Sequence, residues 1–271
     1  MSTETIRATD NPALANKLVA EATSNVEVAA PTPKAVVPLP PDTTVILPGG
    51  LLDPFDGLTT TAEVRELTGA DEEAISKLSD PGKILLAILE RATVKIGDKP
   101  AEKDDLDALL AGDREALILA IRIATFGQKV TVAPQCPKCG EMQEFEIDLV
   151  KDVKTKTLLE EDRTFTVDCK VGKVVVNLPT GFTQKNLINA TNKTAAELDT
   201  ILLKGCIESI NGKPIINIQQ IRDLGVKDRR ELVKAITDRN PGPQLSEIEK
   251  PCTSCESEVP LPLTLADLFR E

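Results

Sequence analysis

Cysteines are the residues most able to do chemistry in this chain of 271 residues, which has six of them and no histidine. Four form two C-x-x-C pairs, Cys136 with Cys139 and Cys252 with Cys255. A C-x-x-C pair on a tight turn presents two sulfur atoms along one edge of a tetrahedron. Two such pairs complete a four-thiolate site, so we predict that these four cysteines bind one structural zinc ion.

Other uses of the cysteines are weaker interpretations. A catalytic zinc ion needs an open coordination position, and four thiolates leave none. A thioredoxin-like redox site needs only one C-x-x-C pair in a βαβ context, so it does not account for two matched pairs. Two local disulfides are a third possibility. Cys169 and Cys206 lie in a strand-like run and on an apolar helix face, so we expect them to pack in the core.

Strand-like runs flank both pairs and predict how they are positioned. KVTVAPQ precedes Cys136, and LSEIEKP precedes Cys252. Apolar residues alternate after each pair, as expected of a second strand. They are Phe145, Ile147 and Leu149 in the first case and Leu261, Leu263 and Leu265 in the second. This strand–knuckle–strand pattern is typical of a zinc ribbon, here with an unusually long insert between its knuckles.

Equivalent residues recur at a nearly constant spacing, which indicates an internal duplication of about 114 residues. Five pairs illustrate it: Gly69 and Gly181, Pro100 and Pro214, Asp113 and Asp228, Cys136 and Cys252, and Cys139 and Cys255. The predicted fold class is therefore α+β with two tandem repeats. Each repeat is a β-hairpin followed by helices and a zinc-knuckle hairpin, and one four-cysteine zinc ribbon joins the two.

Three regions follow from this organisation. Residues 1–41 are rich in Ala, Pro and Thr and predict a disordered or extended arm, which could order on a neighbouring subunit. Residues 42–150 form repeat 1 with the first knuckle, and residues 151–271 form repeat 2 with the second.

Local signals predict the elements within the repeats. Strands are expected at 43–48, 61–67 and on both sides of a tight turn in 164–178, with Gly49-Gly50 in a turn-rich loop. Helices are expected at 83–96, at 114–127 and in a run that ends at 210. Asp113 is a candidate N-cap and Gly127 a candidate C-cap. Asp228 and Glu231 have the spacing of a capping box.

Composition excludes several function classes. Asp and Glu number 43 against 32 Lys and Arg, so the net charge is 32 − 43 = −11, and aromatic residues make up only 2%. Such a chain lacks the basic surface and stacking platforms of a nucleic-acid binder. No stretch is apolar enough to span a membrane, and the N-terminus has no signal-peptide pattern. These features predict a protein made in a reducing cytoplasm. We find no cofactor-binding loop and no catalytic constellation.

Several motifs together resemble the baseplate protein family of T-even-type contractile-tailed bacteriophages. They are V-I-L-P-G-G, E-V-R-E-L-T-G-A-D-E-E, G-D-R-E-A-L-I-L-A-I-R-I-A-T-F-G and C-P-K-C-G. The resemblance covers about residues 43–271 and is strongest at Asp113, Arg114, Arg122, Gly127, Cys136 and Cys139. The chain has Pro-Gly-Gly where Pro-Ser-x-Gly is common in that family.

The resemblance implies a non-enzymatic structural component of a phage tail baseplate or tail tip, located in the virion and assembled in the host cytoplasm. Its partners would be other tail or baseplate proteins, with no membrane or nucleic acid. Arg122 is expected to be a surface or interface charge. One alternative is a tail assembly factor that the virion does not retain. Alternatives of other classes are a nucleic-acid-binding zinc ribbon, which the net charge disfavours, and a redox enzyme.

Overall fold

The computed structural model describes residues 43–53, 57–265 and 267–269. The predicted arm over residues 1–41 lies outside this range. Contacts divide the chain after Leu39, and all described residues belong to the part that follows. Helices and antiparallel sheets alternate along this part, so the predicted α+β class is confirmed.

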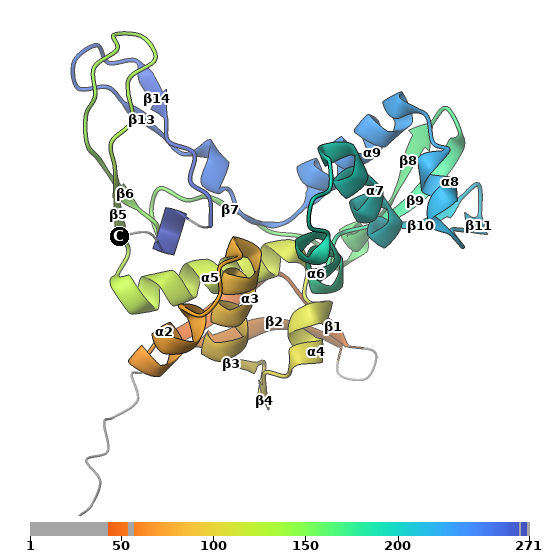
Figure 1. The fold of residues 1–271 in the computed structure, drawn as a ribbon, viewed down its shortest axis with the longest axis horizontal. Coiled ribbons are helices and arrows are strands. Elements are labelled where there is room, and N and C mark those ends of the chain that lie inside the picture. The colour runs from red at the N-terminus through yellow and green to blue at the C-terminus, as the bar shows by residue number, and fades with distance from the viewer. Residues whose placement is uncertain (1–42, 54–56, 266, 270–271) are drawn as a thin grey trace, which may run out of the picture. The chain divides into compact units, whose positions relative to one another are not determined.

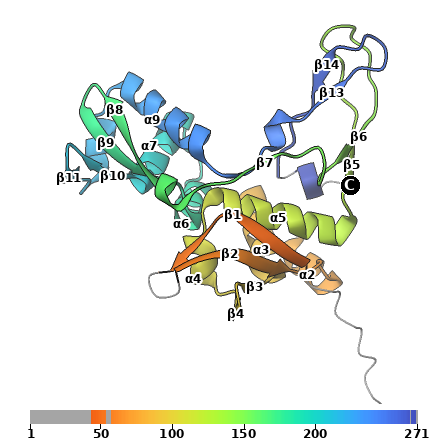
Figure 2. The same ribbon diagram turned by 180° about the vertical axis from the view of Figure 1, so that it is seen from behind.

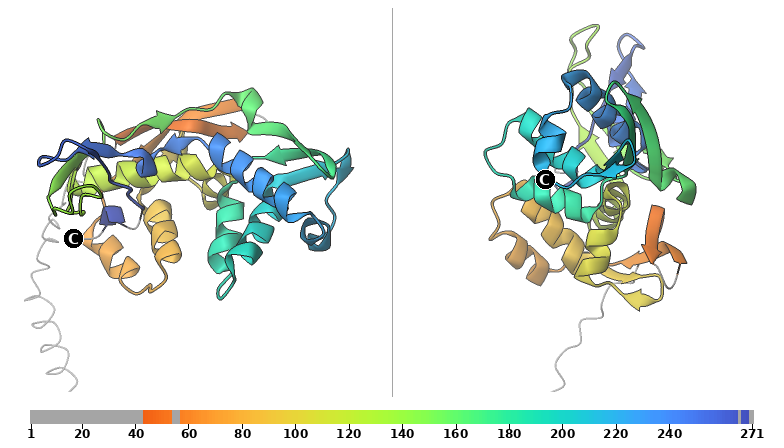
Figure 3. Two further views of the ribbon diagram at one scale, coloured as in Figure 1. Left: turned by 90° about the horizontal axis from the view of Figure 1, so that it is seen from above. Right: turned by 90° about the vertical axis from the view of Figure 1, so that its right-hand side faces the viewer.

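The elements of the first half lead to the first knuckle. They are β1 (Thr43–Asp53), β2 (Gly57–Val64), α2 (Gly69–Ile75), α3 (Pro81–Ala92), β3 (Thr93–Ile96), β4 (Lys99–Pro100), α4 (Lys103–Ala108), α5 (Ala111–Phe126), β5 (Lys129–Val132) and β6 (Phe145–Asp148). Strands β1-β2-β3-β4 form one antiparallel sheet in that order. Figure 3 shows α3 and α5 on one face of this sheet, where Leu89, Leu117 and Ile121 are fully buried.

The elements of the second half follow a similar order. They are β7 (Thr155–Lys156), η2 (Glu160–Arg163), β8 (Thr164–Cys169), β9 (Gly172–Asn177), α6 (Gly181–Asn189), α7 (Ala195–Cys206), β10 (Ile207–Ile210), β11 (Lys213–Pro214), α8 (Ile218–Arg222), α9 (Val226–Arg239), β12 (Gly242–Pro243), η3 (Leu245–Glu247), β13 (Glu249–Pro251), β14 (Glu258–Pro260) and η4 (Asp267–Phe269). Strands β8-β9-β10-β11 form the second four-stranded sheet (Figure 1). Its core includes Cys206, which is buried as predicted, and Cys169 packs at the edge of that core.

Local sequence explains where most helices start. The Asp80 side chain accepts a hydrogen bond of 2.9 Å from the Lys83 N–H, with Pro81 at the first helical position of α3. Thr194 and Glu197 form a capping box at the start of α7. Gly127 ends α5 with a positive φ of 85°, as predicted.

Two predicted helices are too long at their C-terminal ends. Residues 93–96 and 207–210 were expected to be helical, but they form the strands β3 and β10. Each follows its helix directly and pairs with the preceding hairpin, β3 with β2 and β10 with β9. Apolar spacing alone does not separate the last turn of a helix from a short buried strand, and here the sheet pairing decides.

The predicted caps at Asp113 and Asp228 are wrong, because α5 and α9 each start two residues earlier than those aspartates. Both side chains are buried and bind a β-hairpin instead of their own helix. Asp113 accepts hydrogen bonds from the N–H groups of Gly49 (2.6 Å) and Gly50 (3.1 Å). Asp228 accepts them from Lys170 (3.2 Å) and Val171 (3.1 Å).

Gly49 and Gly50 lie within β1, where the register with β2 shifts, and not in a loop. Such an irregularity frees backbone N–H groups from the ladder, which is why the Asp113 carboxylate can accept both of them. The Arg163 guanidinium donates to the carbonyl oxygens of the same two glycines. A buried carboxylate and a guanidinium thus hold one short segment of backbone.

Arg122 is buried, and its predicted role as a surface or interface charge is wrong. Its guanidinium donates to the carbonyl oxygens of Leu268 and, at 2.9 Å, of Gly127, and it lies 4.9 Å from the centroid of the Phe126 ring. Carbonyls at a helix C-terminus and in a 3₁₀ turn lack helical partners, so a nearby guanidinium satisfies them. Arg122 therefore fastens η4 to the end of α5.

Candidate metal centre

The four cysteines of the two C-x-x-C pairs come together, with their sulfur atoms all within 4.8 Å of one another. The pairs interdigitate: Cys136 Sγ lies 3.7 Å from Cys255 Sγ, and Cys139 Sγ lies 3.7 Å from Cys252 Sγ. Cys136 and Cys252 are buried, Cys255 is half-buried and Cys139 is exposed. We call this group the cysteine quartet.

Two antiparallel hairpins carry the quartet. Strands β5 and β6 flank the first knuckle, and β13 and β14 flank the second; both hairpins stand next to each other in Figures 1 and 2. Val132 pairs with Phe145 in the first hairpin. At the equivalent place in the second, the Leu261 N–H donates to the Ile248 carbonyl over 2.8 Å. The predicted strands on both sides of the first knuckle are confirmed, whereas β14 ends just before the apolar run at 261–265.

The backbone of each knuckle closes in the same way. The Cys136 N–H donates to the Glu141 carbonyl (2.8 Å), and the Cys252 N–H donates to the Ser257 carbonyl (2.9 Å). Gly140 and Glu256 then donate their N–H groups back to Cys136 and Cys252, each over 2.9 Å. Because the chain must reverse sharply after the second cysteine, both residues have positive φ, 76° and 57° respectively.

Polar side chains support the sulfur atoms. The Ser257 hydroxyl lies 3.0 Å from Cys255 Sγ and 3.5 Å from Cys136 Sγ, so it bridges the two hairpins. Gln143 donates its amide N–H to Cys252 Sγ over 2.9 Å, while its oxygen accepts from the Thr253 hydroxyl. Donors of this kind stabilise thiolates and orient them toward a metal ion. Sequence reasoning missed Ser257 and Gln143, because neither follows a motif.

The sulfur spacing fits a tetrahedral metal ion better than disulfides. Metal–sulfur bonds of about 2.3 Å place the sulfur atoms of a tetrahedron about 3.8 Å apart, whereas a disulfide needs about 2.05 Å. Both cross-knuckle separations are 3.7 Å, and all six cysteines are free thiols. The quartet could therefore hold one metal ion with four sulfur ligands.

Without a metal ion, the thiols of the quartet shift one another's pKa values. The N–H of Cys139, followed by the Ser257 hydroxyl, lowers the pKa of the Cys136 thiol to about 6. The Glu141 N–H lowers the pKa of the Cys139 thiol, but interactions with the neighbouring thiols outweigh it and raise that pKa to about 12. One thiolate thus makes the next harder to form, and a divalent cation relieves that repulsion.

A second group of possible ligands consists of Cys169, Asp228 and Glu231, whose ligand atoms also lie within 4.8 Å of one another. The Asp228 carboxylate already accepts two backbone hydrogen bonds, and Glu231 is exposed and lies 3.5 Å from the Lys227 ammonium. Since both carboxylates have partners and only one of the three groups is sulfur, the quartet is the stronger candidate site.

The family model of the T4 bacteriophage base plate protein matches residues 56–240, which is more than half of the chain. The chain therefore belongs to the T4 bacteriophage base plate protein family, and the predicted resemblance is confirmed. The match includes the first knuckle and ends before the second. Neither curated proteins nor solved structures yield a significant match. Within the described residues, no helix is both long and apolar enough to span a membrane.

Proposed function

We propose that this protein is a non-enzymatic structural component of a phage tail baseplate or tail tip, and that a zinc ion bound by Cys136, Cys139, Cys252 and Cys255 stabilises it. The observation that carries the proposal is the quartet within a chain of the base plate family. The family supports a baseplate-related structural role and contacts with other tail proteins.

Zinc is the proposed metal because thiolate-only tetrahedral sites favour it, and such closed sites are structural. In this chain the ion would link hairpins whose cysteines are 113 and 119 residues apart in sequence. When bound, zinc supplies four metal–sulfur bonds that hold these hairpins together. The chain's own residues supply the knuckle turns and the donors from Ser257 and Gln143.

We also propose that the chain is an internal duplication, with repeat 1 over residues 42–150 and repeat 2 over residues 151–271. Matched interactions support it. Asp113 and Asp228, 115 residues apart, each bind two N–H groups of the preceding hairpin. The next residues also match: Arg114 donates to the Leu106 carbonyl (2.5 Å), and Arg229 donates to the Ile221 carbonyl (3.2 Å), each eight residues back.

We further propose that the arm over residues 1–41 orders on a neighbouring subunit during assembly. The net charge of −11 supports protein contacts over nucleic-acid contacts, since phosphate binding needs clustered Lys and Arg. It also limits non-specific association before docking.

The test is quantitative mass spectrometry of purified phage particles, with zinc measured on the purified chain. We expect the chain in tails at a fixed ratio to other baseplate proteins, with one zinc ion per chain. Its absence from particles but presence in assembly intermediates would establish an assembly factor instead. Metal-free protein that stays folded would refute the zinc assignment.

A further inference from the structure

Glu115 is a carboxyl group without a partner in a largely apolar setting. It lies in the first half of α5 and is half-buried. Among the described residues, none makes a hydrogen bond or an ion pair with its side chain. Burial alone raises its pKa to about 7, because nothing nearby compensates the charged form.

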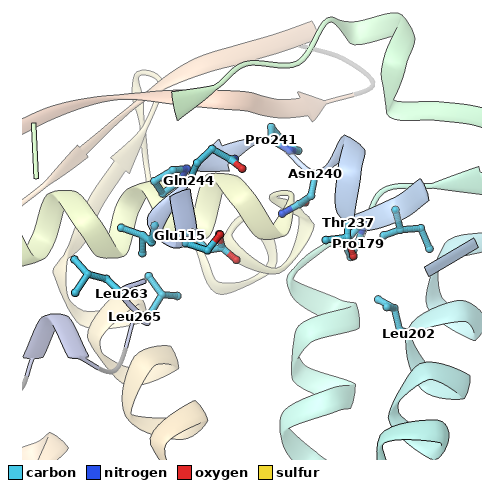
Figure 4. A pocket seen from close by; sticks show the side chains of 13 residues that line it. Glu115, Pro179, Leu202, Thr237, Asn240, Pro241, Gln244, Leu263 and Leu265 are labelled. Carbon is cyan, nitrogen blue, oxygen red and sulfur yellow. The ribbon is translucent and has the colours of Figure 1, made fainter. Parts of the chain in front are cut away.

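The Glu115 side chain reaches into a pocket of about 400 Å³. Figure 4 shows Leu263 and Leu265 on one side of the carboxylate, and Pro179 and Leu202 on the other. Among the described residues that line this pocket, Glu115 alone carries an ionisable group. A carboxylate that enters such a site needs a cation to offset the loss of water.

Asn240 lines the same pocket. Its Oδ1 is buried and has no hydrogen-bond donor among the described residues. Two other polar groups of the lining are already paired: the Thr237 hydroxyl donates to the Val233 carbonyl (3.0 Å), and the Gln244 amide donates to the Gly242 carbonyl (2.9 Å). Among the described residues of the lining, none offers a positive charge to the Glu115 carboxylate.

We propose that this pocket receives an arginine side chain from a partner tail protein, an inference that rests on the proposed function for its partner class. A guanidinium carries five N–H donors at its edge, so one group can donate to both oxygens of the Glu115 carboxylate. Its flat faces and its methylene stem suit walls of leucine and proline. An apolar side chain would leave the Glu115 carboxylate unpaired, and an acidic one would be repelled.

The test is an NMR titration of the full chain with the peptide acetyl-Leu-Arg-Leu-amide. The matched control peptide contains citrulline, which keeps the shape of arginine and removes its charge. We expect the arginine peptide to shift the side-chain amide signals of Asn240 and Gln244 and to bind at least tenfold more tightly than the citrulline peptide. Glu115→Gln should abolish this preference.

The matched control variant is Glu73→Gln, which removes the same charge from an exposed site on α2 and should keep the preference. Equal shifts with both peptides, no shift up to the solubility limit of the peptides, or an unchanged preference in Glu115→Gln would each overturn the proposal.

The result is independent of the test of the proposed function. A chain found in tails that shows no preference for arginine would refute the pocket proposal alone. A chain that prefers the arginine peptide but is absent from phage particles would refute the baseplate role, and with it the assignment of the partner as a tail protein.

Discussion

Gly112 in the first turn of α5 and Gly242 in β12 meet backbone to backbone. A Cβ atom on Gly242 would lie 2.8 Å from Gly112 Cα, and one on Gly112 would overlap the carbonyl group of Pro241. Only two residues without side chains fit this approach, which brings the segment after α9 against the start of α5. The contact borders the Glu115 pocket, because Pro241 and Pro243, the two neighbours of Gly242 in sequence, line that pocket.

Gly112→Ala should therefore destabilise the fold by about 2–3 kcal/mol, since the overlap is with backbone that cannot rotate away. The measurement is the free energy of unfolding from urea denaturation. Gly69→Ala is the matched control: Gly69 starts α2 and its added Cβ would meet nothing within 4 Å. Equal stability of the Gly112→Ala variant and the natural chain would contradict the close packing.

Cys139→Ser should abolish zinc binding and lower the free energy of unfolding by several kcal/mol, because zinc sites of this type contribute on the order of 10 kcal/mol to folding. Zinc content by elemental analysis and thermal unfolding measure the two effects. Cys169→Ser, which changes a cysteine outside the quartet, should keep one zinc ion per chain. Full zinc content in Cys139→Ser would remove Cys139 from the ligand set.

Glu256→Gly should stabilise the second knuckle. Glu256 has a φ of 57°, a conformation that costs a residue with a Cβ roughly 1 kcal/mol and costs glycine little. The reverse change at the equivalent position, Gly140→Ala, should destabilise the first knuckle by a similar amount. Chemical denaturation of zinc-loaded protein checks both signs, and a destabilised Glu256→Gly variant would show that the Glu256 side chain has a contact of its own.

Asp113→Ala should lower the free energy of unfolding by about 2–4 kcal/mol, because the buried N–H groups of Gly49 and Gly50 lose their acceptor. Asp228→Ala should cost less, since the N–H groups it binds are only partly buried. Asp104→Ala, at an exposed site in the first turn of α4, is the control. A smaller loss for Asp113→Ala than for Asp228→Ala would contradict this ranking.

Glu115 should make stability depend on pH with an unusual sign for a carboxylate. Its pKa is raised from 4.5 to about 7 in the folded chain, so the folded state holds the proton more tightly than the unfolded state. The resulting stability is complete below pH 4.5 and is lost as the pH rises through 7, by about 1–3 kcal/mol in total.

Glu115→Gln should remove this dependence, which urea denaturation at pH 5 and at pH 8 measures. Glu73→Gln should keep the dependence of the natural chain. If the natural chain and Glu115→Gln lose the same stability between these two pH values, the Glu115 carboxyl is already charged at pH 5.

The quartet and the hairpins that carry it could be predicted from sequence, because C-x-x-C spacing and alternating apolar residues are local signals. The roles of Asp113, Asp228 and Arg122 could not, since their partners are backbone groups far along the chain, such as Gly49 for Asp113 and Leu268 for Arg122. An aspartate that caps a helix and an aspartate that accepts hydrogen bonds from a distant segment look alike in sequence, because both lie near the start of a helix. The pocket around Glu115 was missed for the same reason, as it forms only where separate segments meet.

The distance along the chain between Cys139 and Cys252 also determines how long after the first knuckle the ribosome synthesises the second. The two are 113 residues apart, so at about 5–20 residues per second the second knuckle is synthesised roughly 6–23 s after the first. During that interval Cys136 and Cys139 are an open dithiol, which can exchange with cellular disulfides and bind other metal ions. Completion of the quartet thus waits for the synthesis of Cys252 and Cys255, and a product that stops short of Cys252 keeps a half-site.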